Sequence, residues 1–495
     1  MIATHTLPTI AENLRKHASR TAFCIEEQAF TYEEFSGRIS GISRALRERQ
    51  VSAQSPVGVV TSNRLETYAS IFALWFNRLI FVPLSPANPA ERNRSMMEQT
   101  GMKHVLAYRK EEVEALGGSG ALEAVETKGL SSGEVVGPAA GSLEKDILYI
   151  LFTSGSTGMP KGVPISRRNL DAFVHAFFRI GYGLNEEDRF LQIFDFTFDV
   201  SVQSYVLPLY LGAGVYTVPQ EGIKFMAALK ILKEHEITFA KLVPSTLQFF
   251  RPYFSRIHLP RLRYSLFSGE ALPESITREW ARCVPNAAIE NHYGPTEGTI
   301  DCLYHRWEDG KSPSYNGIVA IGRPYEGISA LVIGSDGNPA DPGQKGELWI
   351  SGGQVTPGYW KNEAKNQESF AIREGKRYYK TGDIVFQEQE GRYLFCGRKD
   401  NQLQIQGYRV ELGEVEHHVK QFMDKNLVVD SYEENGVLAL ALFVEGLKEG
   451  EKEEIEARLR RKLPHYMIPG RIISVGAFPR TISGKTDRQK LRRLL

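Results

Sequence analysis

The chain has 495 residues, enough for more than one hydrophobic core. A hydrophobic fraction of 42% and a charged fraction of 24% are ordinary for a globular protein. The 60 basic and 59 acidic residues leave a formal charge of +1, which gives no reason to expect a nucleic-acid partner. The four cysteines lack metal-ligand spacing, and the N-terminal segment has no signal-like apolar core. We therefore expect a reduced, cytoplasmic protein.

Helical patterns alternate with short β-branched or aromatic runs through the first 300 or so residues. Alternation of this kind predicts α/β layers with largely parallel sheets. The segment 116–141 is rich in Gly, Ser, Glu and Ala and is interpreted as a surface excursion. The longest apolar stretch, 68–84, is interrupted by Asn77 and Arg78 and is too polar to span a membrane. The clearest predicted strands are 57–60, 79–83, 147–153 and 215–218.

Turn signals become dense from about Gly317, which predicts a β-rich subdomain. A second unit begins near residue 400. Its pattern predicts a helix over 412–422, a strand over 438–444 and a charged helix over 452–463. About 95 residues of this kind form a small α+β domain. The predicted fold class is therefore α/β, with a large N-terminal domain of several subdomains and a small α+β C-terminal domain.

The most informative segment is 149–162, which reads YILFTSGSTGMPKG. A buried strand runs into a loop of small and hydroxylated residues that is closed by Pro160 and Lys161. Small residues let backbone amides approach an anion, and a lysine adds positive charge. The spacing is not that of a Walker loop. The sequence predicts an anion-binding loop made of Thr153, Ser154, Gly155, Ser156, Thr157, Gly158 and Lys161.

This loop resembles the phosphate-binding signature of the adenylate-forming enzymes, which include acyl-CoA synthetases, luciferases and the adenylation domains of nonribosomal peptide synthesis. Further segments resemble signatures of that family in the same order, from about residue 30 to the end. They read FTYEE at 30–34, NHYGPTE at 291–297, GELWISGGQVTPGYW at 346–360, YKTGD at 379–383, GRKDNQLQIQGYRVE at 397–411 and SGKTDR at 483–488. Two departures are Ser483, where the family usually has Asn, and Pro357, where many relatives have Arg.

The resemblance implies two α/β sheets and a β-rich subdomain in an N-terminal adenylation core domain, 1–398. It implies a hinge at 399–402, in which Asp400 absorbs the backbone change, and a mobile C-terminal domain, 403–495, that carries a catalytic lysine. In this family the small domain rotates between two half-reactions. A carboxylate first attacks the α-phosphate of ATP, and a thiol then displaces AMP.

The resemblance also implies binding of ATP and Mg²⁺. Tyr293 would stack on adenine, and Thr296 would touch the α-phosphate. Asp383 would accept hydrogen bonds from the ribose hydroxyls, with help from Arg398. Glu297 would bind Mg²⁺, because this hard cation prefers carboxylate and phosphate oxygens. The expected nucleotide-binding set is Thr153, Ser154, Gly155, Ser156, Thr157, Gly158, Lys161, Asn291, His292, Tyr293, Gly294, Thr296, Asp383 and Arg398.

The expected catalytic residues are Lys485, Thr296 and Lys161. Lys485 would bridge the attacking carboxylate and the α-phosphate, where negative charge builds in the transition state. The Gly407 face of the small domain would line the path of the thiol in the second step.

Amino-acid-activating members of the family carry Phe-Asp at the position of Phe198 and Asp199, and the aspartate pairs with the substrate ammonium. Asp195 is a weaker candidate for that role, and Asp199 could instead cap a helix. The side-chain pocket has two open interpretations. Lys241 and His292 could receive an aspartate-like carboxylate, or Lys241 could pair with Asp301 and leave a small polar pocket. The expected substrate-binding set is Asp199, Val200, Gln203, Lys241, Leu266, Ser268, His292, Ile300, Asp301 and Lys485.

The predicted function is therefore that of a standalone ligase that adenylates an amino acid and charges a separate phosphopantetheinylated carrier protein, with neither nucleic acid nor membrane as partner. The segments LFSGEALP and NHYGPTEGTI also resemble D-alanine–carrier protein ligases, although Ser268 and Lys241 depart from their usual pattern. The sequence also leaves open an acyl- or aryl-CoA ligase, a luciferase-like oxygenase and an inactive scaffold. Retention of Lys161, Glu297, Asp383 and Lys485 together argues against a scaffold.

Overall fold

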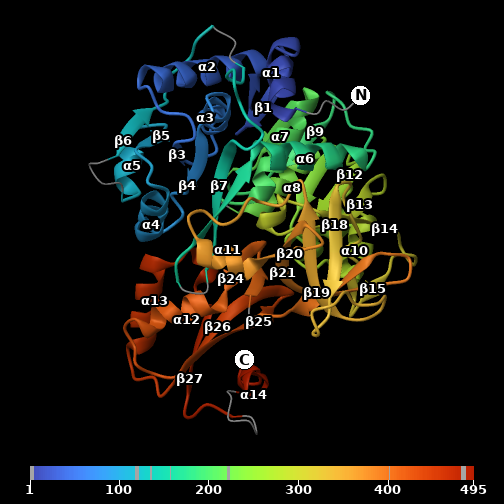
Figure 1. The fold of residues 1–495 in the computed structure, drawn as a ribbon. Coiled ribbons are helices and arrows are strands. Elements are labelled where there is room, and N and C mark those ends of the chain that lie inside the picture. Colours follow the sequence, from blue (N-terminus) through green and yellow to red (C-terminus); the bar gives the residue numbers. More distant parts are fainter. Residues whose placement is uncertain are drawn as a thin grey trace.

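The computed structural model describes residues 5–117, 122–133, 137–155, 158–219, 223–400, 402–480 and 487–495. A large N-terminal domain is built around two mainly parallel sheets, and a smaller domain at the C-terminal end, orange to red in Figure 1, lies against it. This is the predicted fold class. In the described part of the chain, no helix is long and apolar enough to cross a membrane.

The first sheet has nine strands, and its central strands are parallel, as the alternating pattern predicts. Its two edges are finished by antiparallel neighbours, β14 and β17 on one side and β2 on the other. In spatial order the strands are β17 (Arg323–Pro324), β14 (Leu303–Trp307), β13 (Ala288–Tyr293), β12 (Tyr264–Phe267), β11 (Phe239–Leu242), β9 (Arg189–Gln192), β10 (Gly214–Thr217), β1 (Thr21–Ile25) and β2 (Gln28–Thr31).

The second sheet has six strands and is parallel except at its last pair, where β8 returns antiparallel to β7. Its strand β6 lies inside the segment interpreted as a surface excursion, so that interpretation was wrong for these four residues, which pair with β5. In spatial order the strands are β6 (Glu123–Glu126), β5 (His104–Ala107), β3 (Pro56–Val60), β4 (Ile80–Leu84), β7 (Ile147–Thr153) and β8 (Lys161–Ser166).

Helices cover both sheets and join their strands (Figure 1). Capping boxes start two of them, at Thr31 with Glu34 and at Ser166 with Asn169. In the N-terminal domain the helices are α1 (Thr6–Lys16), α2 (Tyr32–Glu48), α3 (Leu65–Phe76), α4 (Ala90–Thr100), α5 (Glu111–Ala115), α6 (Arg167–Arg179), α7 (Asp199–Leu211), α8 (Lys224–Glu234), α9 (Ser245–Phe250), α10 (Glu274–Ala281) and α11 (Glu363–Ser369), with 3₁₀ turns η1 (Arg251–Arg256) and η2 (Thr296–Gly298).

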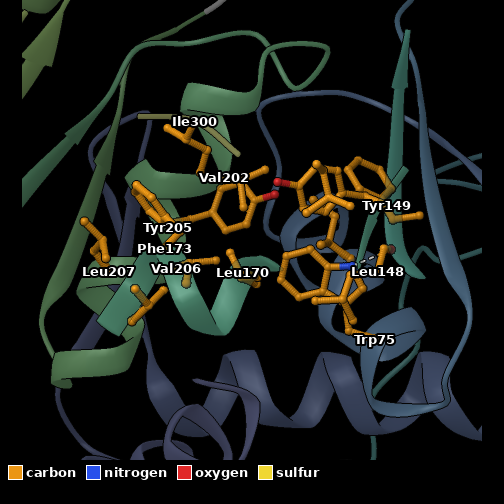
Figure 2. Close-up of a cluster of buried hydrophobic side chains, with 14 of the residues drawn as sticks. Trp75, Leu148, Tyr149, Leu170, Phe173, Val202, Tyr205, Val206, Leu207 and Ile300 are labelled. Atoms are coloured by element: carbon orange, nitrogen blue, oxygen red, sulfur yellow. Dashed lines mark hydrogen bonds between the residues drawn. The ribbon is translucent and has the colours of Figure 1, made fainter. Parts of the chain in front are cut away.

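In the main core, aromatic side chains of α3, from the second sheet, pack against Tyr205 of α7, from the first. Figure 2 shows Trp75, Tyr149 and Tyr205 packed there, with the Trp75 indole donating to the Leu148 carbonyl at 2.8 Å. All three side chains are fully buried. Because α7 begins at Asp199, this packing fixes where that carboxylate lies.

The predicted β-rich subdomain is an antiparallel sheet in which the long strand β21 pairs with three neighbours. Its strands are β18 (Ile328–Ile333), β19 (Gly346–Gly352), β21 (Lys376–Gln387), β20 (Phe370–Arg373) and β22 (Tyr393–Arg398), and a short ladder nearby joins β15 (Ser314–Tyr315) to β16 (Ile318–Val319).

The C-terminal domain has a hairpin, a three-stranded sheet and helices on both faces of that sheet. The hairpin strands are β23 (Gln402–Ile405) and β24 (Tyr408–Glu411), and the sheet strands are β25 (Leu427–Glu434), β26 (Val437–Glu445) and β27 (Arg471–Val475). The helices are α12 (Leu412–Lys420), α13 (Glu451–Lys462) and α14 (Arg488–Arg492), with the 3₁₀ turn η3 (His465–Met467). The predicted elements at 412–422, 438–444 and 452–463 are confirmed to within two residues.

Candidate functional site

A cavity of about 620 Å³ lies between the two domains, at the carboxyl ends of the central strands of the first sheet. Open α/β sheets bind ligands at this edge. Its wall combines residues of both domains, including Thr153, Ser154, Phe198, Asp199, Val200, Ser268, Asn291, His292, Tyr293, Gly294, Pro295, Thr296, Ile300, Asp383, Arg398, Asp400, Gly407, Tyr408 and Arg409.

The predicted anion-binding loop joins β7 to β8, and the antiparallel register brings Thr153 opposite Lys161. A methyl group on Gly155 would lie 2.0 Å from the Met159 carbonyl oxygen, so this close turn needs glycine. The Lys161 ammonium lies 3.1 Å from a carboxylate oxygen of Glu411. Burial is the largest cause that lowers the pKa of Lys161, and Arg409 adds to it. Ser156 and Thr157 lie outside the described residues.

The NHYGPTE segment forms the end of β13 and the turn η2 beside it. Tyr293, Gly294 and Thr296 line the cavity. A methyl group on Gly294 would lie 2.2 Å from the Ile300 carbonyl oxygen, so this turn also needs glycine. The Asn291 side-chain amide donates to the Val319 and Ala320 carbonyls at 3.2 and 3.0 Å. Both partners are backbone groups, so these hydrogen bonds are structural.

Glu297 is fully buried, and both of its carboxylate oxygens accept from the Arg409 guanidinium, at 3.0 and 2.9 Å. The Tyr359 hydroxyl donates to it at 2.6 Å. Burial raises the pKa of this carboxyl, but Arg409 and Tyr359 outweigh that effect and the pKa is lowered overall. The guanidinium shows that the position accepts a cation. In the part of the chain that the structure describes, no cluster of three metal-ligating side chains occurs. Glu297 is thus a single carboxylate whose present partner is a cation.

Asp383 and Arg398 are paired across β21 and β22. The Arg398 guanidinium donates to Asp383 at 2.6 Å and to both oxygens of Asp400 at 2.7 and 2.8 Å. The Tyr293 hydroxyl donates to the other Asp383 oxygen. Burial raises the pKa of Asp383, against the influence of Arg398 and Tyr293. The structure therefore brings together Tyr293, Asp383 and Arg398, the side chains predicted for adenine and ribose.

Asp199 lies at the start of α7 and is buried against the cavity. Phe198, not Asp199, is the N-cap residue, so a capping role does not explain the carboxylate. Burial raises its pKa to about 7, with Asp301 adding to the rise and Thr296 and Lys241 opposing it. Among the described residues, Asp199 has no basic partner within 4.0 Å.

The predicted side-chain pocket divides into two layers. Val200, Ser268, His292 and Ile300 line the cavity. Behind them, fully buried and not part of the lining, lie Gln203, Lys241, Leu266 and Asp301. These four residues were predicted to line the pocket, and in this structure they lie behind its wall.

An ion pair holds the second layer, and His292 of the first layer has buried partners of its own. The Lys241 ammonium contacts Asp301 and donates to the Gln203 amide oxygen at 2.7 Å. His292 contacts Glu290 at 3.0 Å through Nε2 and the Tyr325 hydroxyl at 2.6 Å through Nδ1. Lys241 and His292, which sequence reasoning offered to an acidic substrate, thus already have carboxylate partners.

Sequence reasoning assigned no role to several side chains that join the two domains at the cavity. Arg409 and Glu411 stand inside the GYRVE segment, so their motif was visible. Glu414 pairs with Arg92, 322 residues away, and nothing in the sequence links them. Glu270, in LFSGEALP, accepts from the Gly407 amide at 2.8 Å.

Lys485 lies outside the described residues. The helix that follows it, α14, packs on the face of the C-terminal sheet opposite to α12 and α13. Arg488 and Arg492 of α14 contact the Val429 carbonyl and Asp430. Figure 1 shows α14 on the far side of this sheet from the N-terminal domain.

Comparison with known proteins gives matches over most of the chain. The model of the AMP-binding enzyme family matches residues 10–360, and the model of the AMP-binding enzyme C-terminal domain matches residues 420–485. A linear gramicidin synthase of Brevibacillus parabrevis is 31% identical over 494 residues, and a plipastatin synthase of Bacillus subtilis (strain 168) is 29% identical over 496 residues. Each covers 97% of this chain, which spans only 9% and 13% of their lengths.

Solved structures give similar matches. The Vibrio cholerae adenylation domain AlmE, in complex with glycyl-adenosine-5'-phosphate, is 25% identical, with a TM-score of 0.86 and coverage of 100% of this chain and 98% of that chain. IdnL7 is 29% identical, with a TM-score of 0.72 and coverage of 99% and 98%. PA1221, a protein containing adenylation and PCP domains, shares the fold at 23% identity, with a TM-score of 0.86 and coverage of 100% and 85%.

Proposed function

Because this chain belongs to the AMP-binding enzyme family, we propose that it adenylates an amino acid with ATP and passes the product to the phosphopantetheine thiol of a separate carrier protein. The observation that carries the proposal is Asp199. A carboxylate that is buried beside the cavity, with no basic group within 4.0 Å among the described residues, is costly unless a ligand supplies a cation. The ammonium group of an amino acid is such a cation. Three other side chains at the cavity, Tyr293, Asp383 and Arg398, suit the adenine and ribose of an aminoacyl adenylate.

In the first half-reaction, a carboxylate oxygen of the amino acid forms a bond to the α-phosphorus of ATP. The bond from that phosphorus to the β-phosphate oxygen breaks, and pyrophosphate leaves. Asp199 orients the amino acid, Thr296 lies beside the α-phosphate, and Lys161 with the loop amides holds the outer phosphates. Glu297 would hold Mg²⁺, which would neutralise phosphate charge when bound. Lys485 is proposed as the cation that bridges the reacting groups.

In the second half-reaction, the carrier thiolate attacks the acyl carbonyl carbon, and the bond to the AMP oxygen breaks. The arrangement of the two domains supports this step, because Gly407 and Tyr408 of the hairpin form part of the cavity wall. Gln248 of α9 and Gly436 of the β25–β26 turn line the same cavity, one from each domain. The domain boundaries at 398 and 403 and the hinge at Asp400 belong to this proposal.

We propose a small polar amino acid, rather than an aspartate-like one, as the substrate. Lys241 is neutralised by Asp301, and His292 contacts Glu290, so an additional carboxylate would find no unpaired cation in this pocket among the described residues. The buried Lys241–Asp301 pair also closes the pocket behind Val200 and Ser268. Within the described ranges the Ser268 hydroxyl has no hydrogen-bond partner, and it borders the cavity, so it is available to a polar substrate group.

Three competing functions predict different substrates. A D-alanine–carrier protein ligase would favour D-alanine, and an acyl- or aryl-CoA ligase would accept acids without an ammonium group. An inactive scaffold would activate none. The buried Asp199 favours an ammonium-bearing acid over the substrates of a CoA ligase. The paired and buried state of Asp383, Arg398 and Glu297 favours an enzyme over a scaffold.

ATP–pyrophosphate exchange across a panel of L-, D- and β-amino acids, with fatty and aryl acids alongside, tests the proposal. We expect exchange with small polar amino acids, lost in Lys485→Ala and strongly reduced, but still measurable, in Asp199→Asn. Preferred exchange with aspartate would overturn the pocket assignment and keep the enzyme class. Exchange with acids that lack an amino group, unchanged in Asp199→Asn, would establish a CoA ligase. Silence across the whole panel would support the scaffold.

A further inference from the structure

The His292 ring lines the cavity, yet both of its nitrogen atoms already have hydrogen-bond partners behind the cavity wall. Nε2 lies 3.0 Å from a carboxylate oxygen of Glu290, and Nδ1 lies 2.6 Å from the Tyr325 hydroxyl. Glu290 and Tyr325 are buried and do not border the cavity. The Tyr304 ring stacks on one face of the imidazole, with 5.9 Å between the ring centroids. His292 therefore presents carbon atoms to a ligand in the cavity.

Glu290 determines the state of Nε2. This carboxylate accepts from the Arg306 guanidinium at 2.8 Å and from the Tyr182 hydroxyl, besides its contact with His292. Burial raises the pKa of Glu290, but His292, Tyr182 and Arg306 outweigh that effect and the pKa is lowered overall. An ionised carboxylate can only accept hydrogen bonds. Nε2 therefore carries a proton and donates it to Glu290.

Tyr325 determines the state of Nδ1. Burial raises the pKa of the Tyr325 hydroxyl well above its usual range, and Asp301 adds to the rise, so the hydroxyl keeps its proton. In the described part of the chain, Nδ1 is the only hydrogen-bond partner of this hydroxyl. A buried O–H group needs an acceptor, so Tyr325 donates to Nδ1. The ring is then neutral, with its single proton on Nε2.

The balance of charge around the ring supports this neutral state. Arg306 already pairs with Glu290, and Lys241 pairs with Asp301, an oxygen of which lies 3.8 Å from Nδ1. A protonated His292 would add a buried positive charge for which these pairs leave no carboxylate, and such a charge is costly. Burial also raises the pKa of the tyrosine hydroxyls around the ring, which belong to Tyr182, Tyr304 and Tyr325.

We propose that Glu290 and Tyr325 are positioning residues that select the substrate side chain through His292. Together they hold the ring as its neutral tautomer with the proton on Nε2, and they keep both nitrogen atoms occupied. At this position the pocket offers the substrate a carbon surface, without a free N–H donor and without a positive charge, so it disfavours an acidic side chain. This inference rests on the proposed function, in which the cavity wall receives the side chain of an amino acid.

Nitrogen-15 NMR of the full chain, labelled in histidine, tests the tautomer directly and needs no turnover. His292→Asn identifies the two ring signals of His292 by their loss. We expect one signal typical of a protonated ring nitrogen and one typical of an unprotonated nitrogen, both unchanged from about pH 8 to about pH 6. In Glu290→Gln the two signals should move toward each other, because the charge that holds the proton on Nε2 is gone. Two protonated nitrogens in that pH range, a proton on Nδ1 alone, or unchanged signals in Glu290→Gln would overturn the inference.

Tyr325→Phe tests the consequence for the substrate, because it keeps the aromatic ring and removes the hydrogen bond to Nδ1. The imidazole can then take up a second proton. Aspartate and asparagine differ in charge but hardly in size, and the ionisation of Asp199 affects both alike. In this variant the ratio of ATP–pyrophosphate exchange with aspartate to exchange with asparagine should rise about tenfold from about pH 8 to about pH 6, since an unconstrained imidazole titrates near pH 6.5. The ratio should stay constant in the unmodified chain.

Tyr304→Phe is the matched control, because it removes a hydroxyl from the ring that stacks on His292 and leaves both nitrogen partners in place. Its exchange ratio should not change with pH. A constant ratio in Tyr325→Phe, with exchange of asparagine retained, would overturn the inference and keep the proposed function. Silence of the unmodified chain with every acid would instead overturn the proposed function. The NMR spectrum of the unmodified chain decides the tautomer in either case, even where Tyr325→Phe fails to fold.

Discussion

At the scale of single residues, the burial of Asp199 leads to a testable prediction. Its pKa is raised to about 7, so in the free protein the carboxyl is largely neutral below that pH and cannot pair with an ammonium group. Asp301 adds to the rise, and Lys241 opposes it. We therefore expect kcat/KM for the amino acid to increase as the pH passes upward through about 7, where Asp199 ionises.

The measurement is ATP–pyrophosphate exchange at limiting amino acid, from about pH 5.5 to about pH 9. Asp199→Asn is the control, because it has the same shape but cannot ionise, and its profile should lack this step. The same step in Asp199→Asn would mean that another group titrates.

The Lys241–Asp301 pair gives a second residue-scale prediction. Asp301→Asn leaves the buried Lys241 without its counter-charge, so the free energy of unfolding should fall by about 3 kcal/mol. The ammonium becomes available to the substrate, and exchange with aspartate should rise relative to exchange with serine. Urea denaturation and the exchange panel measure the two effects.

The double variant Lys241→Met/Asp301→Leu removes both charges. It should recover most of the lost stability without gaining aspartate activity, because apolar replacements of a buried pair are tolerated. If both variants used aspartate equally well, the side-chain preference would not depend on Lys241.

At the scale of elements, the cavity depends on turns that bring backbone segments close together. The turn after β13 is the clearest, since a methyl group on Gly294 would lie 2.2 Å from the Ile300 carbonyl oxygen and 2.6 Å from Asp301 Cα. Gly294→Ala should therefore lower the free energy of unfolding by about 2 kcal/mol and displace Thr296. Thermal denaturation and KM for ATP check both effects.

Gly133→Ala is the matched control for this prediction. A methyl group on Gly133 would meet no atom of the described residues within 4 Å, and the backbone of Gly133 is not in the left-handed region. Its stability should stay within about 0.5 kcal/mol of the unmodified chain. A similar small change in Gly294→Ala would show that the turn can relax.

At the scale of the whole molecule, the C-terminal domain completes the cavity with an aromatic contact. The Tyr408 ring packs edge-on against the Phe198 ring, with 4.2 Å between the ring centroids, and stacks on the Tyr466 ring, with 3.7 Å between the centroids. If only the second half-reaction uses this arrangement, Tyr408→Ala should leave ATP–pyrophosphate exchange within about twofold and slow acyl transfer to pantetheine about tenfold. Equal loss in both assays would mean that Tyr408 serves adenylation too.

Much of this architecture could be predicted from the sequence. Parallel strands that are buried on both faces leave continuous apolar runs, which is why the strands near 57–60, 79–83, 147–153 and 215–218 were found. The strand β6 was missed because its residues, Glu123–Glu126, are half charged and sit at a sheet edge, where no such run is required. Membership in the AMP-binding enzyme family followed from ordered motifs, each of which is continuous in the chain.

The candidate site was only partly predictable. Tyr293, Asp383 and Arg398 were placed by motifs, and the structure brings them into contact. The two layers of the side-chain pocket could not be predicted from motifs. Val200 and Gln203 belong to one helix, but only Val200 lines the cavity and Gln203 lies behind it. Whether Lys241 was paired could not be decided either, since Asp301 is 60 residues away.

The sequence by itself determined the family, the α/β class and the residue types available for phosphate, ribose and ammonium groups, because such chemistry is written in short contiguous motifs. Tertiary structure alone decided which charges already have partners. It paired Lys241 with Asp301, Arg92 with Glu414 and Glu297 with Arg409 across 60, 322 and 112 residues. Electrostatic energy depends on distance in space and on burial, and neither quantity can be read from separation along the chain.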